Sequence, residues 1–197
     1  MNDCLKEEFT LESSVLGFGR DDDRRGKFLG REITLHDWGV SFEGDAKHVN
    51  VLLDEWDMKN CKSVSSPGSG DEKEFEEDKV LLKGLDSTKY RRAAARLNYM
   101  ALDRPELSYA SKEIARGMAN PSEGDVIRLK RVLRFLKGCK RSRINFVWQD
   151  PVDTVTGMSD SDWAGCLKTR RSSSGGTVFM GKHLIHHYSN TQSTVAL

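Results

Sequence analysis

The sequence predicts an α/β chain of the α+β type, with helices in the middle and an antiparallel sheet in the C-terminal third. Between residues 90 and 137, apolar residues recur at the helical period in segments separated by Pro105 and Pro121. Between residues 143 and 188, short apolar segments follow one another at the spacing of hairpins. A chain of 197 residues can hold one large domain or two small ones.

The N-terminal segment, residues 1–27, is weakly patterned and ends in Arg20-Asp-Asp-Asp-Arg-Arg25. Adjacent aspartates also occur in polymerase active sites, where apolar strand residues lie on both sides of the tight turn that carries them. Arginine and glycine flank the aspartates here, so we predict a solvated loop.

Residues 28–62 predict a hairpin followed by a helix. The segments 28–35 and 40–42 read as two strands joined at 36–39, where Gly39 supplies the turn. Asp45 can then cap a helix that ends near residues 58–60. The apolar positions of this helix follow the i, i+3, i+4, i+7 pattern of one buried stripe: Val49, Leu52, Leu53 and Trp56.

Residues 63–86 contain Ser, Pro, Gly and acidic side chains with little to bury. The run 71–78 is acidic except for Lys73 and Phe75. This composition predicts a flexible linker between the first helix and the helical middle of the chain.

Three further helices are predicted within residues 87–141. The first runs from 90 to 102 and ends because Pro105 forces Arg104 away from helical geometry. The second spans 107–118, and Pro121 stops it. The third runs from Glu123 to Lys137 and ends at Gly138, with its inward apolar positions at Val126, Leu129, Val132, Leu133 and Leu136.

The third helix also carries a basic stripe, formed by Lys130, Arg134, Lys137 and the following Arg141. No acidic residue occurs from Val126 to Gln149, although the formal net charge of the whole chain is only +1. A local basic surface can contact nucleic acid, but most basic helix faces are merely solvated, and both interpretations remain open.

The four cysteines are scattered without C-x-x-C pairing, which argues against a zinc ribbon and a disulfide framework. A reducing compartment fits this usage. The sequence has no long apolar run and no signal peptide, so we expect no membrane association and an intracellular, cytoplasmic or nuclear protein.

The most informative short stretch is Thr156-Gly-Met-Ser-Asp-Ser-Asp-Trp-Ala-Gly165. If residues 156–161 form a strand, Asp160 and Asp162 project from one face, and paired carboxylates of this kind suit Mg²⁺. The alternative is that the Ser-Asp-Ser-Asp sequence is a strand end running into an Asx-turn.

Other chemistry-bearing side chains in the C-terminal third favour structural roles. His183 and His187 share a face of a predicted strand, but His186 lies opposite, and no Cys or carboxylate at ligand spacing accompanies them. We therefore predict no zinc site there. Trp148 and Trp163 are predicted to be packing residues.

Several collinear motifs extend over about residues 27–197. The first are Phe28-Leu-Gly-Arg-Glu-Ile33 and Cys61-Lys62 with Pro67. The central motifs are Tyr90-Arg-Arg, Leu97-Asn-Tyr-Met-Ala-Leu-Asp-Arg-Pro-Glu-Leu107, Asn120-Pro121 and Lys130-Arg-Val-Leu-Arg-Phe-Leu-Lys-Gly138. The last are Gly157-Met-Ser-Asp-Ser-Asp-Trp-Ala-Gly165, Arg170-Arg-Ser-Ser-Ser-Gly175 and Ser193-Thr-Val-Ala-Leu197. In this order, the motifs resemble the Pol polyprotein of Copia-type LTR retrotransposons.

The resemblance implies a chain organised in five parts. Residues 1–27 are the weakly patterned segment, 28–62 a reverse-transcriptase hairpin and helix, and 63–86 the linker. Residues 87–141 are similar to thumb and connection helices, and 142–197 to the N-terminal part of an RNase H-like domain with a truncated antiparallel sheet.

The resemblance also implies site residues. The family's first RNase H carboxylate, a ligand of catalytic Mg²⁺, corresponds to Asp160, with Asp162 as a neighbouring metal ligand. The segment 95–99 is similar to the helix that follows the minor groove of the template–primer duplex, so Arg96, Asn98 and Tyr99 are candidates for backbone contact.

The departures from the family bear on activity. The polymerase Asp pair of the family precedes the matched region, and the second RNase H carboxylate follows Thr-Val-Ala-Leu, whereas this sequence ends at Leu197. Asp125 stands where the family usually has His. Because two-metal hydrolysis needs ligands for both ions, we expect a chain that is catalytically incomplete alone.

These expectations give three hypotheses. The first is a Pol fragment that binds template–primer or RNA–DNA hybrid and works with the remainder of the polyprotein. The second is a non-catalytic nucleic-acid-binding module that uses the 123–137 helix. The third is an unstable pseudogene product with an exposed sheet.

Overall fold

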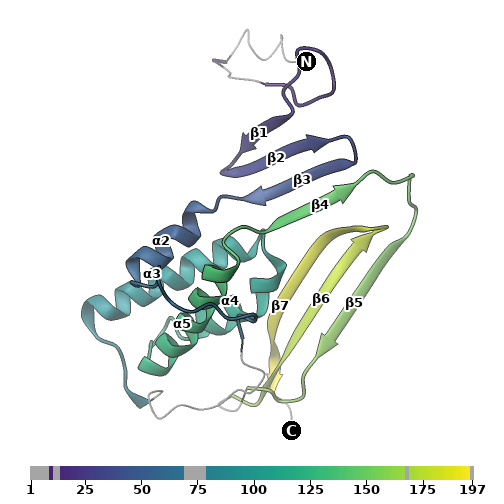
Figure 1. The fold of residues 1–197 in the computed structure, drawn as a ribbon. Helices are drawn as coiled ribbons and strands as arrows, with labels where there is room; N and C mark the ends of the chain where they lie inside the picture. Colours follow the sequence, from purple (N-terminus) through teal and green to yellow (C-terminus); the bar gives the residue numbers. More distant parts are fainter. Residues whose placement is uncertain (1–8, 11–13, 69–78, 167–168, 196–197) are drawn as a thin grey trace.

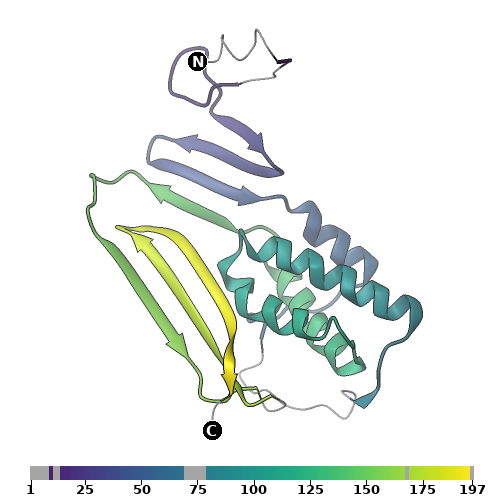
Figure 2. The same cartoon turned by 180° about the vertical axis from the view of Figure 1, so that it is seen from behind.

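The computed structural model describes residues 9–10, 14–68, 79–166 and 169–195, and it confirms a mixed α/β fold. A four-stranded antiparallel sheet lies at one end of the molecule, and a group of helices follows it (Figure 1). A three-stranded antiparallel sheet stands beside the helices, and the view from behind also shows it next to them (Figure 2). Within the described residues, no helix has the length and apolarity needed to cross a membrane.

The first sheet has the order β1-β2-β3-β4. Its strands are β1 (Arg25–Phe28), β2 (Arg31–His36), β3 (Gly39–Gly44) and β4 (Arg143–Val147). The predicted strand 28–35 is wrong at its start, because Leu29 and Gly30 have φ of 49° and 75° and form the turn between β1 and β2. The sequence does not indicate the left-handed conformation of Leu29, since such φ values are rare outside Gly, Asn and Asp.

The predicted hairpin at Gly39 is confirmed, with His36 opposite Gly39 in the β2–β3 register. A glycine is required there for a second reason. A Cβ on Gly39 would lie 2.2 Å from the carbonyl oxygen of Phe146, so only glycine lets β4 approach this closely.

The fourth strand corrects the predicted topology. Segment 143–148 was expected to begin the C-terminal meander, but β4 pairs with β3, with Glu43 opposite Arg143. Glu43 is buried at 5% exposure and accepts hydrogen bonds from Arg141 and Arg143. Because this contact joins distant segments, the local periodicity of the sequence does not predict it.

The described helices are α2 (Lys47–Glu55), α3 (Gly84–Ala101), η2 (Pro105–Leu107), α4 (Ser108–Arg116) and α5 (Glu123–Gly138). Among them, α5 begins after a residue whose side chain caps it. The predicted Asp45 cap is shifted by one residue, because the N-cap of α2 is Ala46, although Asp45 Oδ1 accepts from the Lys47 backbone N–H at 2.8 Å. At α5, Ser122 and Asp125 form a reciprocal capping box. α3 starts earlier than predicted, so the end of the predicted linker is helical.

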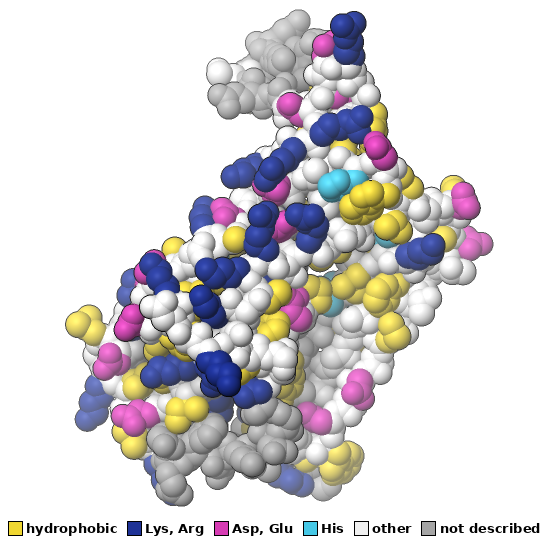
Figure 3. All heavy atoms as spheres, viewed as in Figure 1, with side chains coloured by type: hydrophobic (Ala, Val, Ile, Leu, Met, Phe, Trp, Pro, Cys, Tyr) yellow, Lys and Arg dark blue, Asp and Glu magenta, His cyan; other side chains and the backbone are white. Residues whose placement is uncertain are grey.

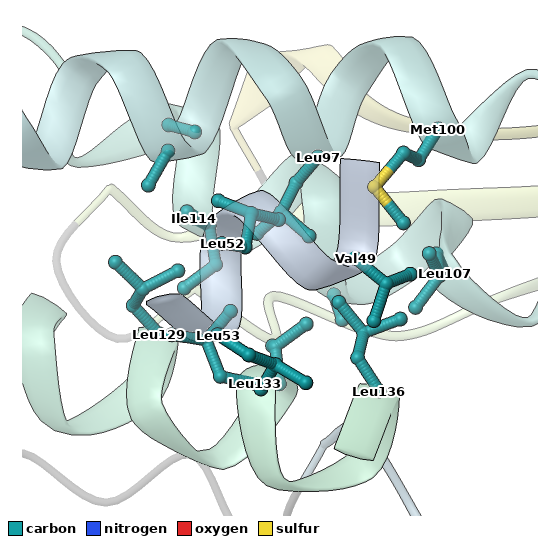
Figure 4. Packing of buried hydrophobic residues seen from close by; sticks show 14 of the residues in the cluster. Val49, Leu52, Leu53, Leu97, Met100, Leu107, Ile114, Leu129, Leu133 and Leu136 are labelled. Atoms are coloured by element: carbon teal, nitrogen blue, oxygen red, sulfur yellow. The ribbon is translucent and has the colours of Figure 1, made fainter. Parts of the chain in front are cut away.

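The apolar stripes of the helices meet in one core (Figure 4). Tyr90, Leu52, Leu97, Leu129 and Leu133 are each 0% exposed. Tyr90 donates its hydroxyl to the Ile114 carbonyl at 2.6 Å, so its polar atom is satisfied inside this core.

Part of the predicted linker lies against α5. Arg134 Nε donates to the Lys62 carbonyl oxygen at 2.8 Å, and a Cβ on Gly138 would lie 3.0 Å from Ser63 Cβ. Further along, Leu81 pairs with Ser122 in a single bridge. Residues 69–78, which include the whole acidic run 71–78, lie outside the described residues.

The second sheet has the order β5-β6-β7. Its strands are β5 (Val155–Ser161), β6 (Arg171–Met180) and β7 (His183–Val195). α4 packs against it, since Ser108 Oγ lies 2.8 Å from His187 Nδ1 and Lys112 Nζ donates to Ser173 Oγ. The prediction that Trp148 and Trp163 are packing residues is wrong, because they are 54% and 76% exposed.

Candidate nucleic-acid and metal sites

Arg96 and Tyr99 of α3 lie together with side chains of two other elements. Arg96 Nη1 is 3.2 Å from His48 Nδ1 of α2, and the His48 and Tyr99 rings are 5.1 Å apart. The Arg31 guanidinium of β2 lies 5.4 Å from the centre of the Tyr99 ring. We call these four residues, Arg31, His48, Arg96 and Tyr99, the α3 surface.

A part-buried ion pair orients the α3 surface. Arg31 Nε donates to Asp103 Oδ1 at 2.8 Å, and this hydrogen bond raises the pKa of Arg31. Burial, followed by the charges of Arg96 and Lys47, lowers the pKa of His48, which favours its neutral form at pH 7. Arg31 and His48 were missed by sequence reasoning, because only the fold brings β2, α2 and α3 together.

The third α3 candidate, Asn98, faces a different neighbour. Its Oδ1 accepts a hydrogen bond from Ser111 Oγ of α4 at 2.5 Å. The Asn98 side chain is exposed but has a protein partner, so it ties α3 to α4 and is separate from the contacts of Arg96 and Tyr99.

The basic stripe predicted on α5 divides into two groups. Arg134 is bonded to the Lys62 carbonyl, and Arg141 forms an ion pair with the buried Glu43. Lys130 is exposed and lines a hollow of about 340 Å³ with Trp56 and others, while Lys137 is half-buried. Basic side chains gather over the helices and the first sheet in Figure 3, with few over the second sheet in that view.

Asp160 lies on the exposed strand β5 and lines an open groove of about 490 Å³. The groove runs between the start of α4 and the face of the second sheet, with Ser108 and Tyr109 on the helical side. Asp160 pairs with Gly175 of β6, and its Oδ1 accepts the Ser161 N–H at 2.8 Å. Strand hydroxyls from β6 line the same groove, so it offers oxygen ligands around one carboxylate.

Asp162 lies just beyond the end of β5 and holds a turn. Its Oδ1 accepts the N–H of Ser173 at 2.8 Å and that of Gly165 at 3.2 Å. These bonds make Asp162 part of a turn at the strand end, as in the alternative interpretation of the sequence, but the local N–H lies three residues on and not two as in an Asx-turn. Asp162 also lines the groove, together with Asp160.

The described residues contain no group of three or more His, Cys, Asp or Glu side chains placed to hold a metal ion. One or two carboxylates with hydroxyls and water suit a weakly held Mg²⁺, since this ion keeps much of its hydration. The donor set at Asp160 and Asp162 fits this type of site, and it lacks the ligands that two metal ions would need.

The chain is similar in sequence to several plant proteins. It is 33% identical over 177 residues to an uncharacterized mitochondrial protein of Arabidopsis thaliana, covering 86% of this chain and 68% of that protein. It is 30% identical over 198 residues to the retrovirus-related Pol polyprotein from transposon RE1 of the same plant. It is 31% identical over 198 residues to the Pol polyprotein from transposon TNT 1-94 of Nicotiana tabacum.

The extent of these matches differs between the relatives. The matches to the two Pol polyproteins cover 98% of this chain but only 13% and 14% of those proteins. No protein-family model and no solved structure gives a significant match.

Proposed function

Because the chain belongs to the retrovirus-related Pol polyproteins of Copia-type retrotransposons, we propose that it binds template–primer or RNA–DNA hybrid duplex. The observation that carries this proposal is the α3 surface. Arg96 and Tyr99, the residues implied to follow a duplex, share one surface with Arg31 of the β2–β3 hairpin. Cationic and aromatic side chains on a rigid surface suit contacts with phosphate and sugar, which carry most of the affinity for a hybrid.

Lys130 and Lys137 of α5 would add electrostatic attraction. Both keep side chains outside the core, and no acidic residue occurs in the surrounding sequence from 126 to 149. Arg134 contributes charge from a fixed position, because the Lys62 carbonyl holds its Nε. The duplex would meet separated cations on α3 and α5, so binding should depend strongly on salt.

We place the boundary between the reverse-transcriptase-like and RNase H-like parts after β4. Local sequence patterns predict that the RNase H-like part begins at residue 142, but β4 completes the sheet of β1–β3, which supports the later boundary. Residues 155–195 then supply the first strands of the RNase H-like part, with Asp160 in the role of first metal ligand.

Hydrolysis would need carboxylates besides those of β5. Asp160 is exposed, and Asp162 is engaged in a turn, so the pair can hold Mg²⁺ weakly but cannot fix two ions. The remainder of a Pol polyprotein is the proposed source of further ligands. Residues 1–197 alone are therefore proposed to bind hybrid without cleaving it.

The binding test is fluorescence anisotropy with a labelled RNA–DNA hybrid at several salt concentrations. We expect affinity to fall as salt rises, and the double substitution Lys130→Gln and Lys137→Gln to reduce the slope by about 2. Lys182 is exposed on the turn between β6 and β7, so Lys182→Gln is the matched control and should leave the salt dependence of affinity unchanged. Undetectable or salt-independent binding would overturn the proposal.

The cleavage test uses the same hybrid with Mg²⁺ and gel analysis of the RNA strand. We expect no cleavage by the purified chain. Cleavage that disappears in Asp160→Asn would contradict the proposed incompleteness and would assign the activity to β5.

A further inference from the structure

A small hollow of about 20 Å³ lies where the first sheet meets the helices. Gly44 at the end of β3, the first residues of α2, and Tyr99 and Arg104 near the end of α3 line it. Lys140 and Ser142, which follow α5, complete its wall. Of these residues, only Tyr99 was a candidate for ligand contact in the sequence analysis.

Arg104 is the unusual member of this wall. Its side chain is 6% exposed; Nε donates to Glu106 Oε1 at 2.8 Å and Nη2 to the Cys139 carbonyl at 2.9 Å. Its Nη1 is buried and has no hydrogen-bond partner in the described structure. An orphaned guanidinium nitrogen is costly to bury, so a ligand atom or a water molecule is expected beside it.

The surrounding charges favour an anion. The two carboxylates that line the hollow are already engaged, Asp103 by Arg31 and Asp45 by Lys47. Lys140 is exposed at the rim, and the start of α2 adds partial positive charge. Arg96, beside His48 at the same junction, has a second buried nitrogen without a partner, its Nε.

We propose that the hollow receives one oxygen of a phosphate group, bound by Arg104 Nη1 with Lys140 at the rim. The volume suits one oxygen-sized atom, since a water molecule needs roughly 10–15 Å³. A guanidinium and an ammonium together suit phosphate, because both are donors without acceptors. The remaining phosphate oxygens would stay outside, which fits a group that belongs to a polymer.

The phosphate is that of a nucleic-acid backbone, and this assignment rests on the proposed function. Tyr99 lines the hollow and belongs to the α3 surface, so a duplex lying on that surface passes the rim. The hollow would fix the position of one phosphate, whereas Lys130 and Lys137 would attract the duplex without fixing it.

The first arm of the test measures hybrid affinity by anisotropy for Lys140→Gln and Arg104→Gln, with Lys182→Gln as control. We expect Lys140→Gln to weaken binding and reduce the salt slope by about 1. Arg104→Gln should weaken binding at least about tenfold, as expected for loss of a buried charge-assisted hydrogen bond. Because Arg104→Gln can impair folding, its melting temperature is measured, and Lys140→Gln decides the outcome if it is unfolded.

The second arm separates free phosphate from backbone phosphate. Melting temperature is compared in sodium phosphate and in sodium chloride at equal ionic strength, for the wild type and Lys140→Gln. One outcome is that phosphate stabilises the wild type, that Lys140→Gln reduces this stabilisation, and that the hybrid does not bind. This outcome would support the hollow as a phosphate site, but it would overturn both the assignment to nucleic acid and the proposed function. Normal hybrid binding by Lys140→Gln, with no effect of phosphate, would overturn the inference and leave the proposed function standing. In that case a water molecule occupies the site.

Discussion

Arg31 and Asp103, which are 72 residues apart in the sequence, form a part-buried ion pair at 2.8 Å between the first sheet and the end of α3. The pair fixes the sheet to the helices and orients Arg31 toward Tyr99. We predict that Asp103→Asn lowers the free energy of unfolding by about 2 kcal/mol, because it weakens a charge-assisted hydrogen bond that is largely shielded from water.

Urea unfolding measures this loss, and the surface pair of Arg24 and Asp37 provides its control. Asp37 is 97% exposed, so Asp37→Asn should cost less than about 1 kcal/mol. Equal losses for the two substitutions would show that the Arg31–Asp103 pair does not join the two parts.

The helical core predicts cooperative unfolding. Leu133 is 0% exposed in the core, so Leu133→Ala should lower the free energy of unfolding by about 2 to 5 kcal/mol. Leu85→Ala, at a side chain that is 87% exposed, should change it by less than about 0.5 kcal/mol. Thermal and urea transitions followed by circular dichroism check both. A broad transition that is insensitive to Leu133→Ala would favour the hypothesis of an unstable pseudogene product.

The capping box of α5 predicts a smaller effect. The Ser122 backbone N–H donates to Asp125 Oδ2 at 2.9 Å, and Ser122 Oγ accepts the Asp125 N–H at 3.2 Å. Ser122→Ala should therefore cost about 1 kcal/mol of stability. Ser159→Ala, at an exposed strand position in β5, is the comparison and should cost less. The same unfolding measurement would contradict the cap if the order were reversed.

The buried carboxylate of Glu43 predicts a dependence of stability on pH. Burial raises its pKa, but hydrogen bonds from Arg141 and Arg143 outweigh burial, and the net pKa lies below the usual value of 4.5. The unfolded chain therefore binds this proton at higher pH than the folded chain does. The stability contributed by Glu43 is complete above about pH 4.5 and is lost as pH falls through the lower folded pKa.

Unfolding free energies between pH 7 and pH 3 test this sign. Glu43→Gln should be less stable than the wild type at pH 7, and the difference should shrink on acidification. Asp45 also has a lowered pKa, chiefly because the Lys47 N–H donates to it, so the variant will retain part of the pH dependence. A difference that grows on acidification would contradict the predicted direction.

Elements with local signals could be predicted from the sequence. The bounds of α5 follow from its apolar period, its Ser122 cap and Gly138, and Asp45 locates the start of α2 to within two residues. These features act within a few residues, so the sequence reveals them directly.

Features that depend on distant contacts could not be predicted. The pairing of β4 with β3 and the contact of Arg134 with Lys62 join segments that local patterns treat separately. The same reason hid Arg31 and His48 from the candidate site and left Arg104 without a predicted binding role. The sequence predicts that Asp160 and Asp162 are neighbours. Only the structure shows, through the hydrogen bonds that Asp162 accepts, that Asp162 holds a turn.

The pairing of Glu43 with Arg143, 100 residues apart, encloses all the described helices between two adjacent strands. Closing so long a loop is entropically unfavourable, so β4 should join the sheet late, after the helices have shortened the distance between its ends. On a ribosome, β1–β3 would emerge with an unpaired edge and wait for about 100 more residues, some 5 to 20 s at ordinary synthesis rates. The helices lie between β3 and β4 in the sequence, and this arrangement therefore sets the order of folding. It also sets how long the free edge of β3 is exposed to aggregation.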